Sequence, residues 1–266
     1  MPVMKNKTLT LSIVIPVYNE ERHLNSCLRS IARQTEKPDE VIVVDNNSTD
    51  KSMAVAAKYP FARILREPKQ HQVYAQKKGF DSAKSDILGR IDGDSILPRD
   101  WVHKVKKAFE NKKVVAVTGG ADPYDVPLKF IGSALFHGYI RLAGLIAGTR
   151  IIWGANCAIR RSAWRSIKPE VLMRPDIWED YDMSFCLKGY GKIRYIPKMK
   201  AGVSFRSVHT SFTKHVRYQF RSVRTFYFRT GLLRLSLFIV LWTTTFIVYP
   251  LAAFDDWLLR RKEKHR

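Results

Sequence analysis

The sequence has few cysteines. Only three occur in 266 residues, Cys27, Cys157 and Cys186, and no two of them form a Cys-x-x-Cys pair. An odd number of widely spaced cysteines indicates neither a disulfide framework nor a zinc site. We therefore expect a protein of a reducing, cytosolic compartment.

The N-terminal region lacks the features of a signal peptide. Its apolar run is short and is interrupted by Pro16 and Glu20, whereas a signal peptide has a continuous apolar stretch behind a basic start. We do not expect the bulk of the chain to be exported by that route.

Acidic residues are missing from a long stretch of the second half. The chain has 46 Lys and Arg against 24 Asp and Glu, a formal net charge of +22. Between Met183 and Phe254 there is no Asp or Glu, but there are twelve Lys or Arg. This asymmetry favours an anionic partner, which could be a membrane surface, a phosphate-bearing substrate or a nucleic acid.

The sequence also shows no internal repeat and no low-complexity linker. Hydrophobic residues make up 45% of the chain and aromatic residues 12%, which is enough to bury one large core or two small ones. Disorder is not expected. The chain reads as one catalytic-type domain to about Gly202, followed by a tail.

The first half of the sequence alternates between strand and helix patterns. Strand patterns lie at residues 11–19, 39–50, 62–68 and 86–94, and helix patterns lie at 21–35, 48–59 and 71–84. Short connections between alternating elements predict an α/β fold with a mostly parallel central sheet and helices on both faces. Ligands of such sheets bind at the carboxyl ends of the strands.

Charged and turn residues follow three of the predicted strands. They are Pro16, Tyr18 and Glu20 after the first, Asp45 after the second, and Asp92 and Asp94 after the fourth. Each group alone could be an ordinary turn, because Asp, Asn and Pro are common turn residues. Three such groups at one sheet edge indicate a binding site.

Asp92 and Asp94 form an Asp-x-Asp pair at a strand end. Two carboxylates on the same side of an extended turn can share a hard cation through oxygen ligands. Mg²⁺ and Mn²⁺ bound in this way usually complete their coordination with waters and substrate phosphates. The pair alone is a weak signal, and it gains meaning from the motifs before and after it.

Five ordered motifs together resemble glycosyltransferase family 2, which has the GT-A fold. They are SIVIPVYNE, VIVVDNNSTD, GRIDGDSILPRDW, GANCAIRR and WEDYDMSFCLKGYGKIRYIP. The resemblance covers residues 11–202 and implies a catalytic domain over residues 1–202. It further implies a transferase of hexosyltransferase type that inverts the anomeric carbon by single displacement.

The resemblance implies roles for individual residues. The nucleotide-sugar pocket would be lined by Pro16, Tyr18, Glu20, Asp45 and Asp92, with Asp45 facing the base. Asp94 and Asp92 would hold Mn²⁺ or Mg²⁺ together with the donor diphosphate, and Asp180 would be the catalytic base.

The chemistry of sugar transfer requires the same division between acids. A departing nucleoside diphosphate gains negative charge that a divalent cation stabilises, which suits Asp94. An acceptor hydroxyl must lose its proton to a carboxylate, which suits Asp180. Glu179 and Asp182 lie beside Asp180, and like charges so close raise at least one pKa. An acidic helix start that meets the helix dipole would give the same cluster.

Three residues are candidates for the acceptor or sugar pocket: Asn156, Trp178 and Glu179. Asn156 belongs to a Gly-Ala-Asn segment that a plain tight turn explains nearly as well. Trp178 could stack on a sugar ring or fill the core.

The sequence departs from the family pattern in two places. Many relatives have a second Asp where this chain has Asn46, and an Arg where it has Gln76. That Arg is a candidate nucleotide or phosphate contact, so Lys77 or Lys78 could replace it here. The departures bear on donor identity more than on reaction type.

The region after residue 202 predicts membrane association. A basic amphipathic segment is expected over residues 203–234, with one apolar helical face made by Phe212, Val216, Phe220, Val223 and Tyr227. Residues 235–254 carry no charge and are long enough to cross a bilayer. A re-entrant, in-plane or buried core helix fits the same pattern. Residues 255–266 form a basic tail.

The sequence thus predicts a glycosyltransferase at the cell membrane, with its catalytic domain on the cytoplasmic side where sugar nucleotides occur. We expect a UDP-sugar donor and a carbohydrate or lipid-linked acceptor, as for a cell-surface or cell-envelope glycan or a glycolipid. A polyprenyl-phosphate acceptor is the alternative. The non-enzyme alternatives are a basic nucleic-acid-binding or membrane-binding protein and an inert membrane-anchored scaffold. Carboxylates at the strand ends would repel phosphate unless a metal lay between, so no nucleic acid is expected.

Overall fold

The computed structural model describes residues 8–125, 129–204 and 212–244. The strands within these ranges are β1 (Leu11–Val17), β2 (Glu40–Asp45), β3 (Ala62–Arg66), β4 (Ile87–Ile91), β5 (Val114–Pro123), β6 (Asn156–Arg160) and β7 (Lys192–Val203). The helices are α1 (Leu24–Ala32), α2 (Ser52–Ala56), α3 (Gln72–Ser82), α4 (Trp101–Phe109), α5 (Lys129–Ala147), α6 (Arg161–Ile167), α7 (Glu179–Leu187), α8 (Phe212–Arg229) and α9 (Leu232–Thr243).

The strands form one sheet in the order β3-β2-β1-β4-β6-β5-β7. β1 pairs in parallel with β2 and β4, β2 with β3, and β5 with β7. Only β6 runs against its two neighbours in this sheet. The predicted mostly parallel α/β fold is therefore confirmed, with one reversed strand in its centre.

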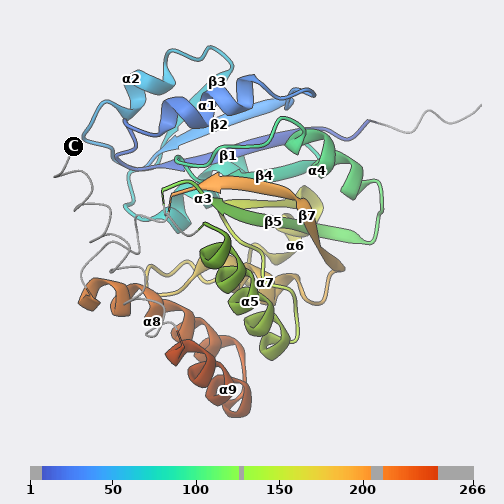
Figure 1. Ribbon diagram of the computed structural model, residues 1–266. Coiled ribbons are helices and arrows are strands. Elements are labelled where there is room, and N and C mark those ends of the chain that lie inside the picture. The colour runs from blue at the N-terminus through green and yellow to red at the C-terminus, as the bar shows by residue number, and fades with distance from the viewer. Residues whose placement is uncertain (1–7, 126–128, 205–211, 245–266) are drawn as a thin grey trace, which may run out of the picture.

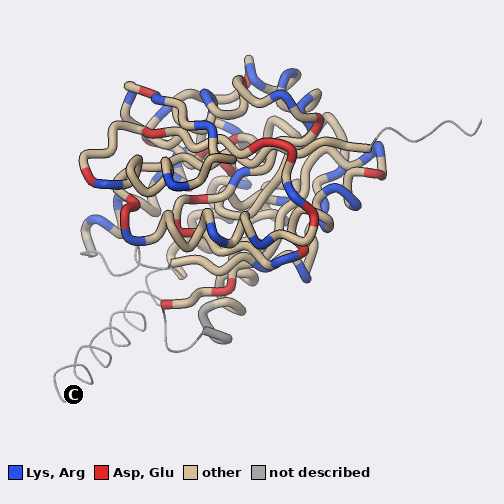
Figure 2. Tube along the Cα trace, turned by 90° about the horizontal axis from the view of Figure 1, so that it is seen from above, with Lys and Arg blue, Asp and Glu red and all other residues tan. Residues whose placement is uncertain are grey.

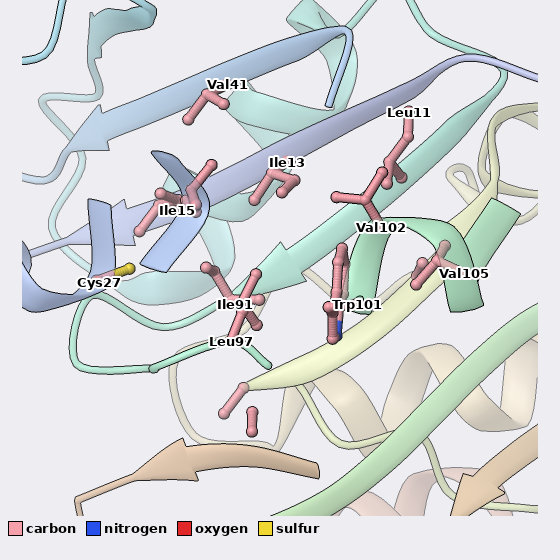
Figure 3. Close-up of a cluster of buried hydrophobic side chains, with 14 of the residues drawn as sticks. Leu11, Ile13, Ile15, Cys27, Val41, Ile91, Leu97, Trp101, Val102 and Val105 are labelled. Carbon is pink, nitrogen blue, oxygen red and sulfur yellow. The ribbon is translucent and has the colours of Figure 1, made fainter. Parts of the chain in front are cut away.

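Helices cover both faces of the sheet (Figure 1). Along β1, Ile13 and Ile15 point into the cluster shared with α1 and α4, whereas Val14 points into the cluster shared with α3, α6 and α7. Trp101 of α4 is fully buried in the first cluster, which Figure 3 shows in close-up. This alternation follows from the two-residue period of a strand with both faces buried.

α3 packs unusually close to the sheet at Gly79. A Cβ atom added to Gly79 would lie 2.2 Å from Cγ1 of Val14 on β1. Glycine is therefore needed here, because any side chain would push α3 away from the sheet. The close packing fixes the other end of α3, at Gln72, near the carboxyl ends of β1 and β4.

The C-terminal helices α8 and α9 pack against α5 and α7 (Figure 1). The rings of Phe226 on α8 and Phe238 on α9 stack with centroids 3.7 Å apart and planes 7° apart. Thr225 Oγ1 accepts a hydrogen bond of 3.0 Å from the backbone N–H of Trp178. The described part of the basic segment predicted at residues 203–234 therefore packs against the α/β domain.

The apolar side chains of α8 are divided between the interior and the surface. Val223 is buried, whereas Phe220 and Tyr227 are 45% and 63% exposed. The face turned inward carries Val223 and Phe226 together with the polar side chains of His215, Ser222 and Thr225, all of which are buried. The hydroxyls of Ser222 and Thr225 bond to backbone carbonyls of the same helix.

α9 covers part of the predicted membrane stretch. It ends at Thr243 after 12 residues, and residues 245–254 of that stretch and the tail at 255–266 lie outside the described residues. None of the helices that the structure describes combines the length and apolar character needed to span a bilayer.

Candidate active site

Four segments of the chain meet at one edge of the sheet. The parallel strands β1 and β2 end together, with Val17 paired to Asp45. The reversed strand β6 begins at the same edge, because its first residue, Asn156, pairs with Ile91 at the end of β4. The residues just after β1, β2 and β4 and just before β6 therefore lie close together, as predicted for a ligand site.

The residues predicted to contact a nucleotide lie at the ends of β1 and β2 or just after β1. Pro16 is buried within β1, and Tyr18 after it is 51% exposed. The N–H of Glu20 donates a hydrogen bond of 2.7 Å to Ser52 Oγ. Asp45 Oδ1 accepts one of 2.9 Å from the N–H of Ser48. The turns after both strands are thereby fixed, with the Tyr18 ring open to solvent.

Asp92 and Asp94 occupy a tight turn after β4. The turn is closed by two hydrogen bonds between Asp92 and Ser95, from Ser95 N–H to the Asp92 carbonyl at 3.0 Å and from Asp92 N–H to Ser95 Oγ at 3.2 Å. Asp92 Oδ1 also accepts a hydrogen bond of 3.0 Å from Gln72 Nε2. The backbone carbonyl of Asp94 accepts one of 3.1 Å from the hydroxyl of Tyr124.

Asp92 and Asp94 remain the candidate ligands of a cation. Within the described residues, no group of three or more His, Cys, Asp or Glu side chains is arranged to hold a metal ion. Mg²⁺ and Mn²⁺ are often bound through one or two carboxylates plus substrate phosphates and water. If Asp92 and Asp94 hold such a cation, the rest of its coordination would come from phosphate oxygens and water.

Asp180 lies in the first turn of α7 and is held by two backbone N–H groups. Its Oδ1 accepts a hydrogen bond of 2.8 Å from Tyr181, and its Oδ2 accepts one of 3.2 Å from Gly154. Burial and the neighbouring charge of Glu179 raise the pKa of Asp180 to about 7, although both hydrogen bonds and Arg90 oppose the rise. A carboxyl group with this pKa can accept a proton near neutral pH.

Arg90 is a site residue that the sequence reasoning missed. It is the last residue but one of β4, is 2% exposed, and places Nη2 at 3.2 Å from Asp92 Oδ1 and 3.1 Å from Glu179 Oε1. A usable signal was present, because Arg90 interrupts the apolar run of β4 two residues before Asp92. Residues two apart on a strand share a face.

Gln72 is the second residue that was missed. Its contact with Asp92 depends on the loop before α3, which Asn46 organises: Nδ2 of Asn46 donates to the carbonyls of Glu67 and Lys69, and Oδ1 accepts from the N–H of His71 at 2.9 Å. An Asp at position 46 has no N–H to give to these carbonyls. The departure from the family pattern at Asn46 is therefore explained by local structure.

Gln76 is the second departure from the family pattern, and it is buried between two helices. Gln76 is 2% exposed and its Nε2 lies 3.0 Å from the sulfur of Met183, in the interface between α3 and α7. Lys77 forms an ion pair of 2.7 Å with Asp81, and Lys78 is exposed. Gln72, one turn nearer the start of α3, is the α3 side chain that the structure brings to Asp92.

Asn156 is not at a pocket wall. Its side chain is 0% exposed, Oδ1 accepts a hydrogen bond of 2.7 Å from Trp101 Nε1, and Nδ2 donates to the carbonyls of Gly120 and Met199. The amide group thus ties β6 to α4, β5 and β7. This corrects the expectation that Asn156 contacts a sugar or an acceptor.

Trp178 and Glu179 lie at the start of α7 beside Asp180. The Trp178 ring is half-buried and packs against the rings of Tyr181 and Tyr218, with centroid distances of 4.9 and 5.5 Å. Glu179 is 9% exposed and paired with Arg90. Asp182 points away from this edge, to Arg229 of α8 and the N–H of Leu172.

Comparison with known proteins identifies the family. The sequence model described as "Glycosyl transferase family 2" matches residues 12–167, which is more than half of the chain. The chain belongs to glycosyltransferase family 2. The expected resemblance is thus confirmed, and family membership favours an enzyme over a nucleic-acid-binding protein or a scaffold.

Curated relatives in this family match only part of their own length. An uncharacterized glycosyltransferase of Nostoc sp. is 26% identical over 198 residues, which cover 70% of this chain and 62% of the relative. Glycosyltransferase AglE of Haloferax volcanii is 31% identical over 119 residues, or 42% of this chain and 39% of the relative. The chain therefore spans less than two thirds of either relative.

Solved structures of similar fold include two enzymes bound to sugar nucleotides or their products. A mannosyltransferase of Pyrobaculum calidifontis in complex with GDP-Man and Mn²⁺ superposes with a TM-score of 0.66 at 18% identity, covering 93% of this chain and 72% of that one. Glucosyl-3-phosphoglycerate synthase of Mycobacterium tuberculosis, in complex with Mn²⁺, UDP and phosphoglyceric acid, gives 0.62 at 19% identity, covering 84% and 79%. These likenesses show that the fold is of the GT-A type.

Proposed function

We propose that the protein transfers a sugar from a nucleoside-diphosphate sugar to an acceptor hydroxyl, with inversion, by a single metal-assisted displacement. The observation that carries the proposal is Asp180. It is a carboxyl group held by the N–H groups of Gly154 and Tyr181, with a pKa raised to about 7, at the same sheet edge as Asp92 and Asp94. The membership in glycosyltransferase family 2 supports it.

The two acidic groups have separate tasks in this reaction. Asp94 and Asp92 hold the divalent cation, Mn²⁺ or Mg²⁺, which supplies charge neutralisation for the departing diphosphate when it is bound. Asp180 removes the proton of the acceptor hydroxyl as that oxygen attacks the anomeric carbon. The bond from the anomeric carbon to the diphosphate breaks as the new glycosidic bond forms, so the configuration inverts.

The donor pocket is formed by the turns after β1 and β2. We propose that Asp45 meets the nucleobase and that the donor is a UDP-sugar. The two structural neighbours carry GDP-Man and UDP, so both bases belong in the test. The acceptor is a carbohydrate or a lipid-linked molecule, with polyprenyl phosphate as the charged form of the second class.

We also propose that the enzyme works at the cytoplasmic face of the cell membrane on a cell-surface glycan or a glycolipid. Large apolar side chains are exposed on α5 and α9; they include Leu142, Leu145, Leu232, Leu233, Leu237 and Val240. Exposed basic side chains lie on the adjacent α8, among them Lys214 and Arg217. Apolar groups beside basic ones suit the interface of an anionic bilayer.

The charge of the rest of the molecule does not single out a nucleic-acid groove. Basic residues are spread over most of the trace with acidic residues between them (Figure 2). The distribution of Lys and Arg therefore gives no specific support to nucleic-acid binding. In the membrane proposal, α8 and its neighbours make the contact with the bilayer.

One experiment tests the reaction. Purified protein in detergent is incubated with Mn²⁺ or Mg²⁺ and a panel of UDP- and GDP-sugars, with and without a glycan, a glycolipid or a polyprenyl phosphate. Release of nucleoside diphosphate that depends on one donor and rises with one acceptor is the expected result. Absence of release from every donor would refute the proposal.

A further inference from the structure

Arg90 is a charged residue in the centre of the sheet. Strand β4 lies between β1 and β6, and the neighbouring Ile87, Leu88 and Ile91 of this strand are fully buried. A charge in such a place is costly unless it is paired. An apolar residue would be sufficient for this position of the strand. The presence of an arginine therefore has to be explained by contacts outside the sheet.

Arg90 makes polar contacts with two acidic side chains of the site, Asp92 and Glu179. Its Nη2 lies 3.2 Å from Asp92 Oδ1 and 3.1 Å from Glu179 Oε1. Its Nε and Nη1 have no hydrogen-bond partner among the residues that the structure describes. The guanidinium thus forms ion pairs with Asp92 on the donor side and with Glu179, the residue before Asp180.

Gly154 gives Arg90 its space and links it to Asp180. A Cβ atom at position 154 would lie 2.2 Å from Nη1 and 2.4 Å from Cζ of Arg90, so the guanidinium lies directly against the glycine backbone. The N–H of the same glycine donates to Asp180 Oδ2. Arg90 therefore contacts both the neighbour of Asp180 in the chain and one of the groups that hold its carboxylate.

We propose that Arg90 is a positioning residue that fixes the distance between the donor-side carboxylate of Asp92 and the acceptor-side carboxylate of Asp180. This inference rests on the proposed transferase function for its catalytic consequence. One nitrogen of this side chain, Nη2, lies close to both acids, and the guanidinium packs against Gly154. Arg90 thus joins the turn after β4, helix α7 and the turn before β6 through charge-assisted contacts.

The test uses Arg90→Met, Arg90→Lys and the matched control Arg229→Met. Arg229 forms an ion pair with Asp182, which is 0% exposed on the same helix α7. The control therefore breaks a buried ion pair of α7 that does not reach the site. Melting temperature and near-ultraviolet circular dichroism establish that each protein is folded.

The expected result is a loss of kcat with little change in KM for the donor. Arg90→Met should lower kcat about 10–100-fold, the range usual for residues that orient groups of a site, whereas Arg229→Met should stay within about 2-fold. Arg90→Lys keeps the charge but lacks the planar group that packs against Gly154, and it should fall between them. If Arg90→Met does not fold, Arg90→Lys is compared with Arg229→Met instead.

Amide hydrogen exchange provides a readout that is independent of activity. In Arg90→Met or Arg90→Lys the amides of Gly154 and Tyr181, which donate to Asp180, should exchange faster than in the parent, and in Arg229→Met they should not. A parent without transferase activity would refute the proposed function, and the exchange rates would still decide the positioning role. Unchanged exchange at both amides, or equal loss of kcat in Arg90→Met and Arg229→Met, would overturn the inference.

Discussion

The backbone N–H of Gly154 donates a hydrogen bond of 3.2 Å to Oδ2 of Asp180, although the two residues are 26 positions apart in the chain. The turn before β6 and the first turn of α7 are thereby joined at the carboxylate that we propose as the base. Arg90 packs on the other side of the same glycine. This small unit connects the acceptor side of the site to the centre of the sheet.

The first prediction concerns the pH dependence of transfer. A base must be deprotonated to act, and the pKa of Asp180 is raised to about 7 by burial and by Glu179. We expect kcat to rise with pH through about 7 and to fall below it. Asp180→Asn should lower kcat by about 10²–10⁴-fold, the usual contribution of a positioned base, while donor binding measured by calorimetry is retained.

The first prediction has a second part, because the same pKa also affects stability. Because the folded pKa of Asp180 lies above its unfolded value, the native state holds more protons between about pH 4 and 7, and stability falls as pH rises through that window. Asp180→Asn removes the buried charge, so its melting temperature should exceed that of the parent at pH 8 and approach it at pH 4. An equal difference at both pH values would show that the Asp180 carboxyl is not the cause.

The second prediction concerns Gly154 itself. Gly154→Ala would place a methyl group 2.2 Å from Nη1 of Arg90, and a buried cation between two acids has little room to move. We expect a large loss of activity and a lower melting temperature. Gly138→Ala is the matched control, since a Cβ there meets nothing within 4 Å. That change, in helix α5, should leave activity intact and stabilise by up to about 1 kcal/mol.

The third prediction concerns the metal. Chelation should abolish nucleoside diphosphate release, and Mn²⁺ or Mg²⁺ should restore it, because Asp92 and Asp94 are suited to a cation that is shared with the diphosphate. Asp94→Asn should raise the Mn²⁺ concentration needed for half-maximal activity and lower kcat about 100-fold or more. Asp100→Asn, a change in the same loop that removes an ion pair with Lys104, should behave as the parent. Full activity in Asp94→Asn would remove this residue from the metal site.

The alternation of strands and helices, the parallel sheet and the edge that carries Asp45, Asp92 and Asp94 could be predicted from the sequence, whereas Asp180 was assigned from the family resemblance. Local patterns sufficed because strand ends of a parallel sheet meet at one edge whatever the details. The charge at Arg90 interrupts the apolar run of its strand, but its partner Glu179 lies 89 positions away, and Gln72 lies 20 positions from Asp92. Periodicity does not encode such contacts, so neither role could be assigned. Asn156 was misplaced for the same reason, as its sequence context resembles a turn while its amide lies in the core.

The fourth prediction concerns Asn156, whose side chain lies in the core and not in a pocket. Asn156→Ala would leave Trp101 Nε1 and the carbonyls of Gly120 and Met199 without their partner, and each unsatisfied buried group costs about 1–3 kcal/mol. We expect a lower midpoint in chemical denaturation, with KM for donor and acceptor close to that of the parent in the protein that remains folded. A changed acceptor preference with unchanged stability would instead return Asn156 to the pocket.

The fifth prediction tests the membrane proposal at α9. Leu233 and Val240 are 76% and 69% exposed and lie seven positions apart, on one face of the helix. The double change Leu233→Ser and Val240→Ser removes apolar area that would enter the interface, and at about 25 cal/mol per Å² this should weaken co-sedimentation with anionic vesicles about 10-fold or more. The control is Phe61→Ser with Ile64→Ser, which removes similarly apolar side chains, 42% and 39% exposed, in and just before the edge strand β3. Binding should fall for the α9 variant, persist for the β3 variant, and weaken for the parent on neutral vesicles, because the basic side chains of α8 contribute through the lipid charge. Equal binding by both variants would show that α9 is not the surface that meets the bilayer.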